Sequence, residues 1–353
     1  MSLTRRQLAG ALALGSAFGL PSLARATQPL YRIEELTAPD RAQVFPEAIN
    51  AHGMVTGAVA SDWPGRNGKA FKGVPGRFKT VPWAGLPSVG LGINDDGVVV
   101  GVRTAHGSGD HPGPAWRWGR EGPAELSVPG APVLDHAVDI NNAGVMVGTS
   151  RARQLWVSDG HEVQLLGLTP GMTNIGAAAI NRHAAVCGTR WSTDTAVGAR
   201  AFVWDGRHEQ ALDSGTFSDV ARDMNDAGQV CGYLQTSQGG ARQAFLWTEG
   251  QCVLLGPFDT PAIWSCANAV NRHGLVVGDA VVESTWSDRH RRVAFVWRDG
   301  VVHDLNKVRD ASSVGWTLLT AIDINDRGQV LGVGRRQVGY RSTRCHYVAT
   351  PIA

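Results

Sequence analysis

The stretch DINDRGQVLG, Asp323 to Gly332, decides how this chain is interpreted, because its closely spaced acids and glycine resemble a calcium-binding loop. A helix-loop-helix calcium site takes an acid at position 12 of its loop, and counting from Asp323 that position is Gly334. Asn325 and Gly328 instead suit the first and fourth positions of a type I turn, where Asn accepts backbone N–H bonds and Gly tolerates a left-handed backbone. We therefore interpret the stretch as a β-hairpin turn and expect no metal site here.

The same phrase occurs seven times along the chain. Each copy has an apolar residue followed by Asn, a Gly three positions after the Asn and another Gly four positions later. Ala184 replaces the first of these glycines in the fourth copy. Successive copies lie 40 to 54 residues apart, and their asparagines are Asn50, Asn94, Asn141, Asn181, Asn225, Asn271 and Asn325.

Two further short segments accompany each copy, an aromatic one such as Ala-Phe-Val-Trp at 201–204 and one ending in Leu such as 301–305. Four short strands in a repeat of about 40 to 50 residues are typical of one blade of a β-propeller. Seven copies predict an all-β, seven-bladed propeller that occupies residues 27–353 as one domain. The chain begins with the outer strand that its last copy lacks, so we expect Tyr31–Leu36 to close the ring.

Residues 1–26 have the features of a signal peptide. Arg5 and Arg6 precede an apolar run at 9–20, which is too short to span a bilayer, and a small-x-small site predicts cleavage between Ala26 and Thr27. The arginine pair indicates the twin-arginine route, with an ordinary secretory signal as the alternative. No later run is long and apolar enough to be a membrane span. We expect a periplasmic or secreted protein.

The charge of the chain argues against nucleic acid as a partner. Removing the three arginines of residues 1–26 from the 33 basic residues leaves 30, against 31 acidic residues, a net charge of −1. Nucleic-acid-binding proteins usually carry a basic excess. The sequence also lacks the motifs of hydrolases, zinc proteases and phosphate-binding loops, so we predict no catalytic residue and no cofactor.

The repeated pairing of Ile-Asn-x-x-Gly-x-Val-Val-Gly with Ala-Phe-x-Trp resembles the bacterial extracellular repeat family named HAF, and the likeness covers about Tyr31 to Pro351. The family takes its name from a His-Ala-Phe in its unit, but here Lys69, Arg200, Gln243 or Val293 stands before the Ala-Phe. The resemblance implies an exported propeller-like repeat protein. It does not imply an enzyme, because the family is defined by its repeat and not by a known activity.

Variable loops on one face of the propeller are the predicted binding surface. The Asn turns and the Asp-Gly or Glu-Gly turns should share one face, which leaves the connections of variable length on the other, where binding usually resides. Several tryptophans without a repeat role lie in those connections, where they either contact a ligand or cover the core. We predict the site between the sixth and seventh units, with the speculative ligand-binding residues Trp264, Trp286, Trp316, Arg289, Arg291, Trp63 and Trp191.

Asp139, Asp223 and Asp323 recur two positions before the Asn in units three, five and seven. They either point carboxylates into the central channel, which would favour an enzyme, or cap turns. Cys187 and Cys231 take the place of buried apolar residues, whereas a Cys252–Cys266 disulfide is left open.

Three functions follow from these features. The leading one is a monomeric binding protein that recognises a glycan, a peptide or an envelope partner through its loop face. The alternatives are a propeller lyase or hydrolase with its site at the channel mouth, and a structural or assembly protein of the cell envelope. Acids and histidines that converge at the axis on the loop face would favour the enzyme.

Overall fold

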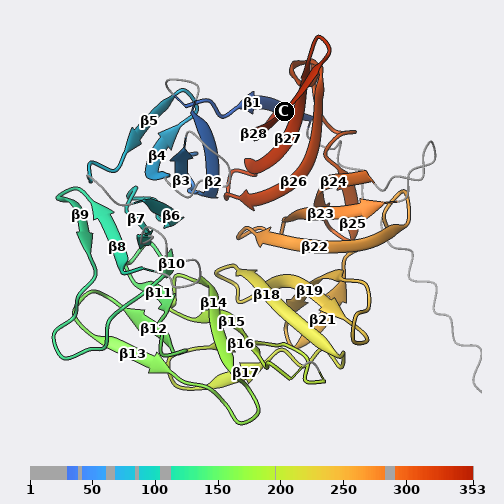
Figure 1. Cartoon of the computed structure of the whole chain (residues 1–353). Helices are drawn as coiled ribbons and strands as arrows, with labels where there is room; N and C mark the ends of the chain where they lie inside the picture. Colours follow the sequence, from blue (N-terminus) through green and yellow to red (C-terminus); the bar gives the residue numbers. More distant parts are fainter. Residues whose placement is uncertain are drawn as a thin grey trace, which may run out of the picture.

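The chain folds into a seven-bladed β-propeller (Figure 1). The computed structural model describes residues 30–38, 42–60, 68–83, 87–103, 113–194, 196–282 and 291–352. Within those residues, 28 strands form seven antiparallel sheets of four strands each. No helix in the described residues is long and apolar enough to cross a membrane. The predicted fold class is confirmed.

Each of the first six blades consists of four consecutive strands, counted outward from the central axis. The first two blades contain β2 (Gln43–Ile49), β3 (Val55–Ala60), β4 (Lys69–Val74) and β5 (Arg77–Thr80), then β6 (Ser88–Ile93), β7 (Val99–Arg103), β8 (Ala115–Gly119) and β9 (Gly122–Glu125). The third and fourth contain β10 (Ala137–Ile140), β11 (Met146–Thr149), β12 (Leu155–Ser158) and β13 (Val163–Leu166), then β14 (Asn174–Ile180), β15 (Val186–Trp191), β16 (Arg200–Trp204) and β17 (Glu209–Ala211). The fifth and sixth contain β18 (Ser218–Met224), β19 (Val230–Gln235), β20 (Gln243–Thr248) and β21 (Gln251–Leu254), then β22 (Ala262–Val270), β23 (Val276–Val282), β24 (Arg291–Arg298) and β25 (Val301–Asp304).

The seventh blade joins the two ends of the chain. Its inner three strands are β26 (Trp316–Ile324), β27 (Val330–Val338) and β28 (Arg341–Ile352), and its outer strand is β1 (Leu30–Glu35). Leu30 pairs with Ile352, and the register continues to Glu35 opposite Tyr347. The ring therefore closes by the N-terminal strand, as the sequence predicts, and leaves no open sheet edge between the first and last blades.

The second glycine of each repeat explains how a blade packs. A Cβ added at Gly148 would lie 2.3 Å from the ring of Trp156, and one added at Gly332 would lie 2.3 Å from the ring of Tyr347. In five blades an aromatic ring of the third strand lies against this glycine of the second strand, and in the other two the glycine pairs with an aromatic residue of the third strand, Phe71 or Trp116. These rings are almost completely buried and form much of the core: Phe71, Trp116, Trp156, Phe202, Phe245, Phe295 and Tyr347.

The five cysteines are all free thiols. Cys187 and Cys231 are fully buried, as predicted, Cys187 in the core cluster between blades four and five and Cys231 in the one between blades five and six. Burial raises the pKa of both thiols well above the ordinary value. Cys252 and Cys266 form no disulfide, so that alternative is not adopted.

Candidate functional site

The seven asparagines of the repeat turns form a ring around the axis. In every turn the side-chain oxygen accepts the N–H four residues on, as Asn50 Oδ1 does from Met54 at 2.9 Å. In six turns it also accepts the N–H two residues on. The amide nitrogen reaches across to the next blade, as Asn50 Nδ2 does to the carbonyl of Asn94 at 2.9 Å.

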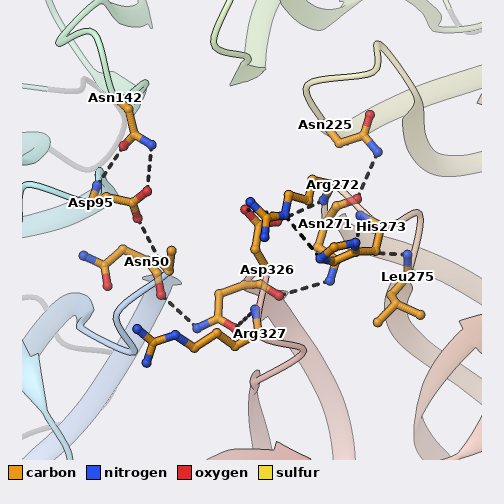
Figure 2. Close-up of polar contacts among 12 residues, drawn as sticks. Asn50, Asp95, Asn142, Asn225, Asn271, Arg272, His273, Leu275, Asp326 and Arg327 are labelled. Carbon is orange, nitrogen blue, oxygen red and sulfur yellow. Dashed lines mark hydrogen bonds and ion pairs between the residues drawn. The ribbon is translucent and has the colours of Figure 1, made fainter.

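Six of the seven blade junctions have this link between neighbouring asparagines. Asn325 Nδ2 donates to the carbonyl of Asn50 at 2.8 Å and so completes the ring at the junction between the chain ends. Figure 2 shows part of this ring, including Asn50, Asn225 and Asn271. Asn181 and Asn225 have no such bond within the described residues. The repeated Asn is thus a turn residue and an inter-blade tie.

The fourth residue of each turn has the predicted left-handed backbone conformation. The first glycine of the motif has positive φ throughout, for example 78° at Gly53 and 75° at Gly328. Ala184 occupies the same position with φ of 60°, a conformation that costs a residue with a Cβ about 1–2 kcal/mol. The hairpin interpretation of the opening stretch is confirmed.

The aspartates two positions before the Asn also tie blades together. Asp139 accepts the N–H of Ile140 at 2.8 Å with one oxygen and that of Ile180, in the next blade, at 3.0 Å with the other. Asp223 bonds Met224 and Val270 in the same way. Asp323 bonds Ile324 and, across the ring closure, Ile49.

This arrangement explains why the aspartates recur in blades three, five and seven. An inner strand has a free edge toward the axis, and the N–H just before each Asn has no strand partner there. One carboxylate serves that N–H in its own blade and in the next, so three carboxylates serve six of the seven blades. The receiving blades have Ala48, Ala179 and Ala269 at the matching position, which leaves room for the neighbour's side chain.

The three carboxylates are held in surroundings that favour the neutral form. Burial raises the pKa of Asp139 and Asp323 to about 7 and that of Asp223 to about 6, and repulsion from Asp223 adds to the shift of the other two. By surface area the three side chains are half-buried. The described residues contain no cluster of three or more metal-ligating side chains. These acids therefore act as inter-blade acceptors.

A polar cavity of about 210 Å³ opens on the face of the Asn turns. The residues after the Asn are linked there at four of the seven junctions: Asp95 accepts the N–H of Ala51 at 2.8 Å, for example, and Asp326 accepts that of Arg272 at 3.0 Å (Figure 2). Arg272 also forms an ion pair with Asp326, with 3.7 Å between Nε and Oδ2. Many polar groups of this mouth therefore bond to groups of the neighbouring blade.

The predicted site residues occupy different environments. Trp63, Trp286 and Arg289 lie outside the described residues. Trp264 and Trp316 begin strands β22 and β26 and are not in loops, which corrects their assignment to the variable connections. Trp316 is only 5 % exposed and packs edge-to-face on Tyr347 with 6.1 Å between ring centroids, so the expectation of an exposed ring is wrong for it.

Trp191 ends β15 in blade four, where its ring lies over Gly176, and is 37 % exposed. It is on the far side of the ring from blade seven (Figure 1). Trp264 is half-buried beneath the guanidinium of Arg292, which lies 5.0 Å from the ring centroid. The predicted tryptophans therefore do not form one exposed group.

A pocket of about 510 Å³ lies between the loop-face ends of blades six and seven, the predicted location. Arg291 and Arg292 line it from β24, Arg335 from β27, and Thr317, Gln337 and Ser342 add hydroxyl and amide groups. Arg291 forms an ion pair with Asp304, with 3.5 Å between Nη2 and Oδ2, and Arg292 forms one with Asp279, with 3.2 Å between Nε and Oδ2. Arg335 has no ion-pair partner in the part of the chain that the structure describes. Arg292 and Arg335 were not among the residues predicted from the sequence, although both lie in short basic runs, at 289–292 and at 335–336.

A second loop-face pocket, of about 620 Å³, lies between blades seven and one and contains Cys345 and His346. Burial raises the pKa of the Cys345 thiol to about 12 and lowers the pKa of His346 to about 4. At neutral pH the thiol keeps its proton and the imidazole is a weak base, so the two do not form an activated nucleophile.

No family model and no curated protein matches the chain. Among solved structures, it is similar to a puromycin-hydrolysing peptidase of Mycobacterium tuberculosis (13 % identity, TM-score 0.47, 91 % of this chain and 56 % of that one). It is also similar to an acylaminoacyl peptidase of Pyrococcus horikoshii (11 % identity, TM-score 0.43, 87 % of this chain and 50 % of that one). A third similar structure is a gluconolactonase of Xanthomonas campestris (12 % identity, TM-score 0.38, 76 % of this chain and 90 % of that one). The chain spans about half the length of the two peptidases. At this identity and TM-score the similarities carry no information on activity.

Proposed function

We propose that this chain is an exported, HAF-like propeller that binds an anionic ligand, foremost an acidic glycan, in the pocket between blades six and seven. The observation that carries the proposal is the lining of that pocket by three arginines, of which Arg335 has no carboxylate partner among the described residues. Guanidinium groups bind carboxylate, sulfate and phosphate through two parallel hydrogen bonds. An anionic group of a ligand would supply the partner that Arg335 does not have among the described residues.

The other groups of the pocket favour a sugar over a peptide. Thr317, Ser342 and Gln337 offer donors and acceptors suited to hydroxyl groups, and the volume of about 510 Å³ accommodates a short oligosaccharide. Arg292 is positioned by two contacts, the ring of Trp264 and the carboxylate of Asp279. A guanidinium held on both sides loses little freedom when it binds a ligand.

Binding is favoured over catalysis because the acids that could work at the axis are committed to backbone N–H groups. Asp139, Asp223 and Asp323 each accept two such bonds. The described lining of the blade six–seven pocket contains no carboxylate or imidazole that could transfer a proton.

The proposal is tested by titrating a galacturonic acid tetrasaccharide into the protein and measuring heat, with the uncharged galactose tetrasaccharide as ligand control. Arg335→Ala should weaken binding by roughly tenfold or more, since a hydrogen bond to a charged group contributes about 1.5–3 kcal/mol. Arg207→Ala, on an exposed turn of the opposite face, is the matched control and should leave Kd unchanged. Equal binding of both tetrasaccharides would exclude anion recognition.

Export is tested separately. The double variant Arg5→Lys, Arg6→Lys should leave the precursor in the cytoplasm if the twin-arginine route carries it. Normal export of that variant would assign the protein to the general secretory route.

A further inference from the structure

The hairpin of β27 and β28 extends beyond its blade. The two strands pair without interruption from Val330 opposite Ala349 to Val338 opposite Arg341, and Gly339 and Tyr340 make the turn. Figure 1 shows this hairpin projecting from the ring beyond the neighbouring blades. A two-stranded projection has no third strand to cover it, so its tip faces solvent.

Apolar side chains gather at that tip. Val338 is 65 % exposed, Tyr340 is fully exposed, and Val314, from the segment before β26, is 80 % exposed. Gly315 accepts the N–H of Gln337 at 2.8 Å, which places Val314 beside Val338. Three of the four most exposed large apolar residues in the described chain thus share one small, convex patch.

Arginines border the patch. Residues 335–344 include Arg335, Arg336, Arg341 and Arg344 and no acid. Arg336 forms an ion pair with Glu35 of β1, whereas Arg341 has no ion-pair partner within the described residues. The hairpin is therefore a local excess of positive charge on a chain whose net charge after residue 26 is −1.

We infer that this hairpin docks on an anionic lipid surface, with Val314, Val338 and Tyr340 entering the headgroup boundary and the arginines contacting lipid phosphates. Tyrosine is enriched at that boundary because its ring is apolar and its hydroxyl is polar, and cationic side chains near an anionic leaflet strengthen binding. A convex tip is too small for a stable protein interface, which needs about 800 Å² on each partner. The lipid surface is thus the partner that both the shape and the charge of the hairpin fit.

The inference is tested by co-sedimentation of the processed protein with vesicles of 30 % phosphatidylglycerol in phosphatidylcholine, against pure phosphatidylcholine. The parent should bind the anionic vesicles at low salt and lose binding as salt rises. The double variant Val338→Ser, Tyr340→Ser should weaken binding at least tenfold, and Arg341→Gln about fivefold. Val301→Ser, an exposed apolar residue on the opposite face, is the matched control and should bind like the parent.

Failure of the parent to bind the anionic vesicles would overturn the inference, and so would undiminished binding by the double variant. The hairpin variants should keep their affinity for the acidic tetrasaccharide, because Val338 and Tyr340 do not line the pocket. The vesicle and tetrasaccharide measurements therefore stand or fall independently.

Discussion

Asp323 and Ile49 are 274 positions apart in the sequence, and a hydrogen bond of 2.7 Å joins the carboxylate of one to the backbone N–H of the other. This bond crosses the junction where the last blade meets the first. The same junction has the Asn325–Asn50 link. The pairing of β1 with β28 inside blade seven joins the two ends of the chain a third time, so the ring is closed by three separate sets of hydrogen bonds.

Removing the Asp323 carboxylate should loosen this junction. Asp323→Ala leaves the N–H groups of Ile49 and Ile324 without their acceptor, which should cost about 1–3 kcal/mol because an unsatisfied, partly buried donor loses its hydrogen bond. Urea unfolding with tryptophan fluorescence measures the loss. Asp326→Ala, which removes one turn-face acceptor, is the comparison and should cost less. Equal stability of Asp323→Ala and the parent would contradict the role assigned to this carboxylate.

The stability of the protein should fall as pH rises from about 4 through 7. Burial raises the pKa of Asp139, Asp223 and Asp323 above the value of an unfolded chain, so the folded state binds protons more tightly than the unfolded state. The stabilisation from these protons is complete below the unfolded pKa and is lost as each group ionises near its folded pKa. The melting temperature should therefore be higher at pH 5 than at pH 8, and Asp223→Asn should reduce that difference. A parent that is more stable at pH 8 would refute the assignment.

Ala184→Gly should stabilise the protein. Ala184 alone among the seven equivalent turn positions has a Cβ at positive φ, and a glycine there removes strain of about 1 kcal/mol at the cost of a more flexible unfolded chain. A small rise in melting temperature is expected. The matched control is Ala143→Gly in the third turn, where φ is not positive and the change should be destabilising. A lower melting temperature for Ala184→Gly would show that the strain is absent.

Trp316→Ala should be strongly destabilising. The ring is buried against Tyr347 in the core cluster of blades six and seven, and truncation of a buried Trp typically costs 3–5 kcal/mol. Trp191→Ala, at a half-exposed ring in blade four, should cost much less. A Trp316→Ala variant that is as stable as the parent but binds the ligand differently would show that Trp316 contacts the ligand and does not support the core.

The architecture could be predicted from the sequence because each blade repeats one local rule. Asn at the first turn position and Gly at the fourth specify the hairpin, and the spacing between copies specifies four strands. The missing outer strand in the last copy indicated the closure by Tyr31–Leu36. These signals depend on local conformation and on repetition, both of which a single sequence displays.

Of the candidate site, the sequence predicted only a place where a pocket is found, between blades six and seven, because the environment of a side chain depends on partners distant in the sequence. Trp316 has no counterpart in the other repeats and so appeared to be a loop residue, yet Tyr347 buries it. The hydrogen bond from Ile49 to Asp323 could not be predicted, because it forms only when the last blade packs against the first. Arg335 lies on a strand whose sequence gave no sign that it meets Arg292 across a pocket.

The binding account is tested most directly by the affinity of the parent and of Arg335→Ala for the galacturonic acid tetrasaccharide at low salt. The pocket between blades six and seven predicts that the parent binds the acidic sugar in preference to the uncharged one. It also predicts that Arg335→Ala loses roughly tenfold or more in affinity while its melting temperature stays that of the parent. A parent that binds neither sugar, or an Arg335→Ala variant with unchanged Kd, would contradict the account.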